Sequence, residues 1–323
     1  MIGRSIADAL IEAPIVTSFT RLGYEARSRL EGWAPLDDYD LSGQVIVVTG
    51  ATSGLGHAAA EQLARCGATL VVVGRDGERN ERVIAELAAS TGNPSITQIP
   101  ADMGDLEQVR HLAERVLAAH DRLDVLIHNA GALDPERRVA PGGTEATVAS
   151  QVVGPFLLTT LLLDRLAASA PARVLTMSSG GMYATGLKVS ELEMAPEDYN
   201  GTEQYARAKR AQVTLNEMWA DRFGDLGVTF HALHPGWADT PGVDAGLPTF
   251  AKVMGPFLRT PEQGADTLVW LAADDTALAS NGRFWLDRAP RPIHKLPTTK
   301  GTDTAERRNR LWDWVAATAD ATQ

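Results

Sequence analysis

From Gln44 onward, short runs of β-branched and other apolar residues alternate with longer amphipathic stretches, and this alternation limits the fold more than any other feature. The runs are VIVVTG, TLVVVGR, SITQIPAD, LDVLIHNAG, ARVLTMSS and VTFHALHPG, with GRFWLD as a candidate last member. Continuous apolar strands joined by helices require a parallel sheet that is covered on both faces. Right-handed crossovers make such a sheet doubly wound. We therefore expect an α/β fold built on a doubly wound parallel sheet.

The chain of 323 residues contains no linker, low-complexity tract or internal repeat. We expect one Rossmann-type domain at residues 41–295, an N-terminal helical extension at 1–40 and a C-terminal helical tail at 296–323. The extension is expected to pack on the domain or on a dimer mate. The alternative is a helix at a membrane surface, or a lid.

Composition excludes several classes of protein. The net charge of −11 argues against a nucleic-acid partner, because phosphate binding requires a basic surface. A single cysteine, Cys66, excludes an internal disulfide and fits a reducing compartment, so a cytoplasmic protein is expected. No histidine spacing indicates a metal site. The longest apolar run, at 155–166, ends in charges and predicts a buried helix rather than a membrane span.

The first strand leads into a glycine-rich turn, TGATSGLG, with Gly50, Gly54 and Gly56 between strand and helix. Glycines here allow a sharp turn and a close approach to a pyrophosphate, which the N–H groups at the helix start can bind. The spacing is G-x-x-x-G-x-G, which differs from the commonest dinucleotide fingerprint. The turn predicts a dinucleotide cofactor.

The second strand ends in Gly74 and Arg75, where an acidic residue would hold the ribose 2′-hydroxyl of NAD(H). A guanidinium can instead bind a 2′-phosphate with two hydrogen bonds. We therefore favour NADP(H) over NAD(H). The alternative is that Arg75 is a solvated turn residue, and the neighbouring Asp76 weakens the signal.

Asp102 and Asn129 close the third and fourth strands, at the edge of the sheet that faces the ligand in such folds. Asp102 is expected either to contact the cofactor or to cap a helix. Asn129 is expected to contact the cofactor, and the alternative is a buried amide that joins neighbouring strands.

Two further strands end in polar residues. Ser178 and Ser179 follow the fifth strand, where a hydroxyl can donate to a carbonyl oxygen as negative charge develops, although turn serines are common. Pro235 and Gly236 form a turn after the next strand, and Thr240 can then face the nicotinamide amide.

Tyr205 and Lys209 stand four residues apart in GTEQYARAKR. On a helix, residues at this spacing share a face, so the ammonium would lie beside the phenol and lower its pKa. This pair predicts an acid and base that can work near neutral pH. The alternative is an ordinary amphipathic helix with an exposed lysine.

The motifs TGATSGLG, HNAG, Ser179 with Tyr205-x-x-x-Lys209, and HPGWADT occur in one order that resembles the short-chain dehydrogenase/reductase superfamily. The resemblance covers roughly residues 44–290. More narrowly, SSGGM, YARAKRAQV and the tail from GRFWLDR to HKLP are similar to the branch called dehydrogenase/reductase member 12.

The resemblance implies roles for individual residues. Tyr205 would be the general acid, Lys209 would bind the nicotinamide ribose and lower the tyrosine pKa, and Ser179 would stabilise the oxyanion. The family adds a proton-relay asparagine, and Gln151 occupies the matching place. The expected cofactor contacts are Gly50, Thr52, Ser53, Gly54, Leu55, Gly56, Arg75, Asp102, Met103, Asn129, Ala130, Gly131, Tyr205, Lys209, Pro235, Gly236 and Thr240.

These observations predict an oxidoreductase that transfers a hydride between NADP(H) and a carbonyl or alcohol substrate. An apolar segment after HPGWADT suggests a lipophilic substrate, unless its side chains merely cover the core: Phe250, Val253, Met254, Phe257 and Leu258. Because Gln151 departs from the family pattern, the alternative is a cofactor-binding sensor or scaffold with little turnover. The protein could be a monomer or a homodimer.

Overall fold

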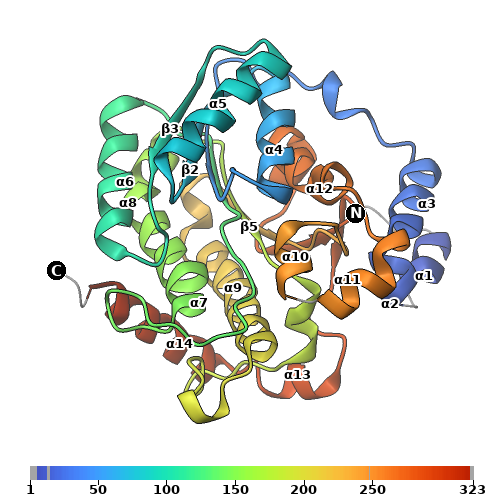
Figure 1. Ribbon diagram of the computed structural model, residues 1–323, viewed down its shortest axis with the longest axis vertical. Coiled ribbons are helices and arrows are strands. Elements are labelled where there is room, and N and C mark those ends of the chain that lie inside the picture. Colours follow the sequence, from blue (N-terminus) through green and yellow to red (C-terminus); the bar gives the residue numbers. More distant parts are fainter. Residues whose placement is uncertain (1–5, 13–14, 247, 321–323) are drawn as a thin grey trace.

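In the computed structural model, which describes residues 6–12, 15–246 and 248–320, eight strands form one sheet in the order β3-β2-β1-β4-β5-β6-β7-β8 (Figure 1). All neighbouring pairs are parallel except β7 and β8, which confirms the doubly wound fold. The strands are β1 (Val45–Thr49), β2 (Thr69–Gly74), β3 (Ile96–Pro100), β4 (Val125–His128), β5 (Ala172–Met177), β6 (Val228–Leu233), β7 (Arg283–Leu286) and β8 (Ala289–Arg291).

Helices cover both faces of the sheet, and a hydrophobic cluster fills each interface. One cluster joins the sheet to α4 (Gly54–Arg65), α5 (Gly77–Thr91) and α12 (Pro261–Ala273). The other joins it to α6 (Leu106–Ala119), α8 (Gly154–Ala168), α9 (Gly201–Phe223) and α14 (Ala305–Asp320). The central strands are buried along their whole length, as their continuous apolar sequences predict.

The helix before β5 continues through three segments: α7 (Ala146–Val148), the π-helical η2 (Ala149–Val153) and α8. Residues 146–168 are long and apolar enough to cross a membrane, but 72% of the apolar window is buried within the protein. That burial is typical of a core helix, in agreement with the buried helix expected at 155–166.

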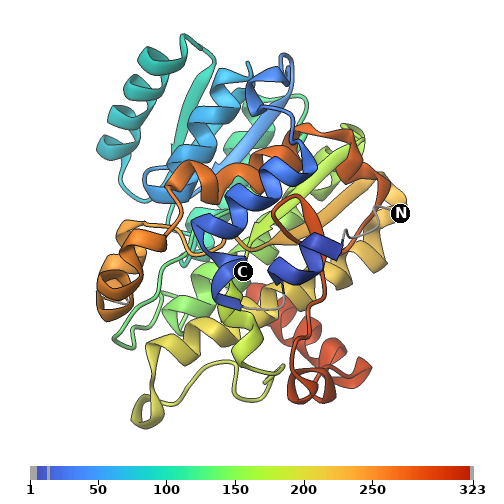
Figure 2. The same cartoon turned by 90° about the vertical axis from the view of Figure 1, so that its right-hand side faces the viewer.

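Three helices precede the sheet: α1 (Ile6–Glu12), α2 (Ile15–Phe19) and α3 (Arg21–Glu31). In Figure 2 they cross the side of the molecule that faces the viewer, and a short turn, η1 (Leu36–Asp38), leads on to β1. The remaining elements are η3 (Gly180–Ala184), η4 (Pro196–Asp198), η5 (Gly224–Leu226), α10 (Pro241–Gly246), α11 (Pro248–Met254), η6 (Gly255–Phe257), η7 (Asp275–Ala279) and α13 (Pro297–Gly301).

The β7–β8 hairpin was not predicted from the sequence. Its two-residue turn consists of Asp287 and Arg288, whose φ angles of 55° and 52° are both left-handed. Turns of this kind favour Asn or Gly, so the sequence Asp-Arg is an unusual signal for one. The next strand is three residues long and contains Pro290, which further obscures it.

Candidate active site

The glycine turn after β1 brings backbone segments closer together than side chains would allow. Gly50 has a φ of 68°, and a β-carbon there would lie 2.7 Å from the Ala130 Cα. A β-carbon on Gly56 would lie 2.1 Å from the Gly50 oxygen. Ser53, the N-cap of α4, makes no side-chain capping bond within the described residues. The first N–H groups of α4 therefore suit a phosphate.

Asn129 holds this turn in place. Its side-chain amide donates to the carbonyl oxygens of Thr49 and Gly50 at 3.2 and 3.1 Å. The Thr49 hydroxyl accepts the N–H groups of both Asn129 and Ala130 at 3.1 Å. The geometry thus supports the joining of strands that was the alternative role for Asn129.

Asp102 does not cap a helix, so that alternative is wrong: the N-cap of α6 is Asp105. The Asp102 carboxylate instead accepts the Gly104 N–H at 2.8 Å. Met103 beside it is buried, and its carbonyl oxygen would lie 2.0 Å from a β-carbon on Gly154. This close approach fixes the loop after β3 against the start of α8.

Two arginines lie near the end of β2. Arg75 is exposed there, and Arg79 from the first turn of α5 donates to the Thr52 carbonyl oxygen at 3.1 Å. Asp76 caps α5 by accepting the Arg79 N–H at 3.1 Å, so its carboxylate has a local structural role. A β-carbon on Gly74 would lie 2.4 Å from the Asn80 side chain. Arg79 could not be predicted from the sequence, because its contact with the glycine turn depends on the fold.

Ser179, Tyr205 and Lys209 meet beyond the ends of β5 and β6. The Ser179 hydroxyl accepts the Gly181 N–H at 3.2 Å and also forms a hydrogen bond with Tyr205. Ser178 instead donates to the carbonyl oxygen of Lys209 at 3.1 Å, within the core. The two serines therefore differ in role, and the geometry favours Ser179 as the candidate that contacts substrate.

Lys209 is 2% exposed, so the alternative of an exposed surface lysine is wrong. Its ammonium lies 5.2 Å from the centre of the Tyr205 ring and donates to the Met177 carbonyl oxygen at 3.0 Å. Burial raises the pKa of Tyr205 to about 12, although the Ser179 hydrogen bond lowers it in part. Burial lowers the pKa of Lys209 to about 7. The predicted lowering of the tyrosine pKa is thus wrong in direction for this arrangement, because desolvation opposes charge on both groups.

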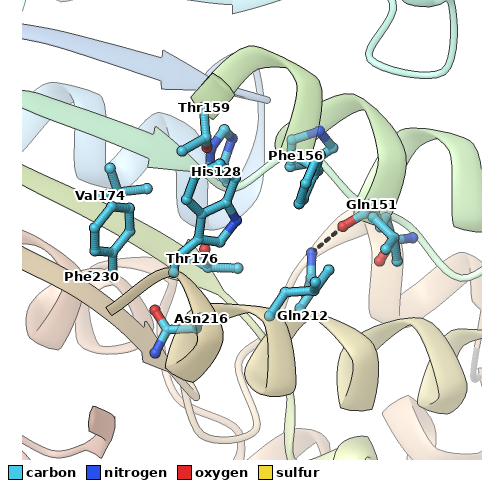
Figure 3. Close-up of a pocket in the computed structure, with 13 residues that line it drawn as sticks. His128, Gln151, Phe156, Thr159, Val174, Thr176, Gln212, Asn216 and Phe230 are labelled. Atoms are coloured by element: carbon cyan, nitrogen blue, oxygen red, sulfur yellow. Dashed lines mark hydrogen bonds between the residues drawn. The ribbon is translucent and has the colours of Figure 1, made fainter. Parts of the chain in front are cut away.

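Gln151 lies in the π-helical η2, and its backbone takes part in a bond that the sequence did not predict. The Gln212 side chain reaches across from α9 and donates to the Gln151 carbonyl oxygen at 2.7 Å (Figure 3). The Gln151 side chain donates to the Ala132 carbonyl oxygen at 2.8 Å and packs against Gly131. Gln212 was missed because nothing in the sequence indicates that it would contact residue 151.

A cavity of about 30 Å³ lies behind Gln151, between α8 and α9. Four buried polar atoms among its lining residues have no hydrogen-bond partner among the described residues: His128 Nδ1, Gln151 Oε1, Gln212 Oε1 and Asn216 Nδ2. A cavity of this size, with these polar atoms in a mostly apolar lining, suits one or two water molecules. It is too small for an organic substrate.

The turn after β6 approaches the glycine turn from the other side. Gly236 has a φ of 78°, and a β-carbon there would lie 2.2 Å from the Arg259 Nε atom. Arg259 also donates to the Pro235 carbonyl oxygen at 3.3 Å. A β-carbon on Gly54 would lie 3.4 Å from the Thr240 side chain, so the two turns are neighbours. Arg259 is a further residue that the sequence analysis missed.

The side chains of the apolar segment after this turn differ in how far they are exposed. Phe250 packs edge-on against Trp237, with ring centres 5.1 Å apart, and Leu258 is buried. Val253 and Phe257 are 68% and 46% exposed. The structure therefore supports an apolar wall at Phe250 and Trp237, but not at every residue that the sequence suggested. Within the described ranges, no group of three His, Cys, Asp or Glu side chains could hold a metal ion.

Comparisons with known proteins agree with this geometry. A family model described as short chain dehydrogenase matches residues 44–247. Dehydrogenase/reductase SDR family member 12 of Homo sapiens is 38% identical over 290 residues, which cover 89% of this chain and 90% of the relative. Retinol dehydrogenase 12 of Bos taurus is 32% identical over 310 residues, covering 94% and 96%.

Solved structures show the same fold. A protein of Escherichia coli CFT073, solved as a complex with NADPH, is 25% identical, with a TM-score of 0.64, and the match covers 79% of this chain and 100% of that one. The expected resemblance to the superfamily and to its member 12 branch is confirmed. This chain belongs to the short chain dehydrogenase family.

Proposed function

We propose that this protein transfers a hydride between NADP(H) and a lipophilic carbonyl or alcohol substrate. The observation that carries the proposal is the meeting of Ser179, Tyr205 and Lys209 beside the two turns that suit a dinucleotide. When bound, the nicotinamide cofactor supplies or accepts the hydride.

The three side chains have complementary roles in reduction. The Tyr205 hydroxyl donates its proton to the carbonyl oxygen, and its pKa of about 12 keeps it protonated at neutral pH. The Ser179 hydroxyl donates a hydrogen bond to the same oxygen as negative charge develops. Lys209, with a pKa of about 7, holds a proton that can be exchanged near neutrality, and it would bind the nicotinamide ribose when the cofactor is present.

NADP(H) is proposed as the cofactor because cationic groups surround the end of β2. Arg75 is exposed there, and Arg79 is bonded to the glycine turn at Thr52. A carboxylate cannot replace Gly74 without displacing Asn80, and Asp76 is engaged as a helix cap. Two guanidinium groups at this place suit a 2′-phosphate.

A lipophilic substrate is supported by the aromatic wall of Trp237 and Phe250, which follows the Pro235–Gly236 turn. The name of the bovine relative, a retinol dehydrogenase, points to an apolar alcohol as the substrate of that protein. We extend this class of substrate, not the particular compound, to the present chain.

The second candidate is a cofactor-binding sensor or scaffold with little turnover. It is favoured by the bond from Gln212 to the Gln151 carbonyl oxygen, at the position where the family would place its proton relay. If this bond blocks the relay, the protein would bind NADPH yet reduce substrates slowly.

A substrate panel separates the two candidates. The purified protein is incubated with NADPH or NADH and a series of aldehydes and ketones of increasing apolar size, beside a Tyr205→Phe variant. We expect NADPH oxidation that rises with apolar size and falls about 100-fold or more in the variant. NADPH binding without turnover, not restored by Gln151→Asn, would instead favour the sensor.

A further inference from the structure

The N-terminal extension inserts one aromatic side chain behind the candidate active site. Phe19, at the end of α2, is 3% exposed, and its ring lies edge-on to His234 with ring centres 4.3 Å apart. A β-carbon on Gly180, the residue after Ser179, would lie 3.0 Å from the Phe19 ring. Phe19 therefore contacts both the serine loop and the end of β6.

Backbone bonds join the extension to the turn after β6. The Phe19 carbonyl oxygen accepts the Trp237 N–H at 2.7 Å, directly after Pro235 and Gly236. The Trp237 carbonyl oxygen accepts the Arg259 N–H at 2.7 Å. Residue 237 is thus held from both sides, by the extension and by the segment that follows α11 and η6.

The Arg259 side chain ties these segments together. Its guanidinium donates to the carbonyl oxygens of Phe19 and Ser18 at 3.1 and 3.0 Å, and to that of Pro235 at 3.3 Å. It fills the space beside Gly236 that a β-carbon would occupy. One buried cation therefore supports both the extension and the turn.

A carboxylate balances that charge. Asp287, at the tip of the β7–β8 hairpin, accepts two bonds from Arg259 at 2.5 and 3.0 Å and one from Arg27 of α3 at 2.6 Å. All three side chains are at most 1% exposed. Burial raises the pKa of Asp287, but Arg259 and Arg27 outweigh it and hold the pKa below its ordinary value. The carboxylate stays ionised, and Arg27 is the ion-pair partner that the extension contributes to it.

A chain of aromatic contacts leads from the extension to α11. The Phe19 ring packs edge-on against Trp237 at 5.6 Å, and Trp237 packs edge-on against Phe250 at 5.1 Å. Trp237 is partly exposed, whereas Phe19 is not. Phe19 therefore acts on a substrate only through its neighbours, one of which, Trp237, is partly exposed.

We propose that the N-terminal extension is a working part of the active site, in which Phe19 and Arg259 are positioning residues. Arg259 sets the Pro235–Gly236 turn, which would contact the nicotinamide of a bound cofactor, and Phe19 sets the angle of Trp237, which limits the size of the substrate. The proposal rests on the proposed function, because it takes this turn to contact the cofactor.

Two chemically matched variants test the cofactor half of the proposal. Arg259 and Arg288 are both buried, and each donates two bonds to a carboxylate, Arg288 to Asp266 at 2.8 and 2.7 Å. Arg288 also anchors the extension, through the Ala34 carbonyl oxygen at 2.9 Å, but Arg259 is the one bonded to Pro235. Replacing either arginine with lysine keeps the positive charge but removes the planar guanidinium that makes paired hydrogen bonds.

In the full-length chain, Arg259→Lys is expected to weaken NADPH binding about tenfold and to speed amide hydrogen exchange at residues 234–240. Arg288→Lys is expected to lower the Tm about as much as Arg259→Lys does, while NADPH binding and exchange at residues 234–240 stay as in the wild type. Equal effects of the two variants, or no effect of Arg259→Lys on either readout, would overturn the proposal. If the wild type binds neither NADPH nor NADH, the proposed function fails, while exchange at 234–240 still decides whether the extension holds the turn.

Phe19→Leu tests the substrate half, with Phe19→Ala as the larger change. Because Phe19 supports the Trp237 ring, we expect KM for bulky apolar substrates to change about tenfold while KM for small aldehydes stays constant. Should Phe19→Ala not fold, the leucine variant carries the test alone. A uniform fall in kcat for all substrates, with KM unchanged, would show a merely structural role for Phe19.

Discussion

The Lys209 ammonium faces the Tyr205 ring at 5.2 Å but gives its hydrogen bond to the Met177 carbonyl oxygen at 3.0 Å. Sequence spacing placed the two side chains on one face of α9, and the structure agrees. The spacing could not reveal that Met177 competes for the ammonium, nor that burial would dominate both pKa values.

Lys209→Arg tests this arrangement. Arginine keeps a positive charge but cannot lose its proton near neutral pH, and its planar head is larger than an ammonium. We expect kcat/KM to fall about 100-fold. Lys188→Arg serves as the control, because Lys188 is 39% exposed and pairs with Glu203 at the surface. Turnover that survives Lys209→Arg would remove Lys209 from the proposed mechanism.

Arg75 and Arg79 are predicted to select the cofactor. Each charge-assisted bond to a 2′-phosphate contributes about 1.5–3 kcal/mol, so replacing either arginine with alanine should weaken NADPH binding at least about tenfold. NADH binding should not change in Arg75→Ala, and in Arg79→Ala it should fall less than NADPH binding, because that variant also loses the bond to Thr52. Arg82→Ala, on the exposed surface of the same helix, is the matched control. An equal loss of NADPH and NADH affinity would contradict the assignment of the 2′-phosphate to these residues.

Buried histidines are predicted to make the fold sensitive to acid. Burial lowers the pKa of His128 and His234 to about 3 and that of His231 to about 4. The unfolded chain, with histidine pKa values near 6.5, therefore binds more protons below pH 6.5, and stability falls as the pH drops. Between roughly pH 6 and 4 the three histidines contribute a slope of up to about 4 kcal/mol per pH unit.

Urea unfolding at about pH 7 and pH 5 measures that slope. His128→Gln should reduce the slope by the contribution of one proton, roughly 1.4 kcal/mol per pH unit. His111→Gln should leave it unchanged, because the His111 side chain is 68% exposed. A slope that does not respond to His128→Gln would show that His128 does not contribute to the acid sensitivity.

The part of the site that could be predicted depends on local signals. Gly50 and Gly54 sit in a strand-to-helix turn, and their left-handed φ angles explain why glycine is needed there. The missed residues act over long distances in the sequence: Arg259 bonds to Phe19 across 240 positions, and Gln212 to Gln151 across 61. A lone arginine or glutamine in a sequence carries no sign of a buried partner, since such side chains are usually exposed.

Asp287→Asn is predicted to be the most destabilising of these changes. The Asp287 carboxylate is the partner of Arg27 and Arg259 at the centre of a fully buried cluster. Asparagine tolerates the left-handed backbone at this position, so the loss of stability in this variant reports the removal of the charge alone. Removing one partner of a buried ion pair costs about 3–5 kcal/mol, and that loss should appear in urea unfolding. Asp275→Asn is the control, because its carboxylate pairs with Arg173 while 92% exposed and should contribute less than about 1 kcal/mol. Similar losses for the two variants would mean that Asp287 does not hold the extension on the domain through its charge.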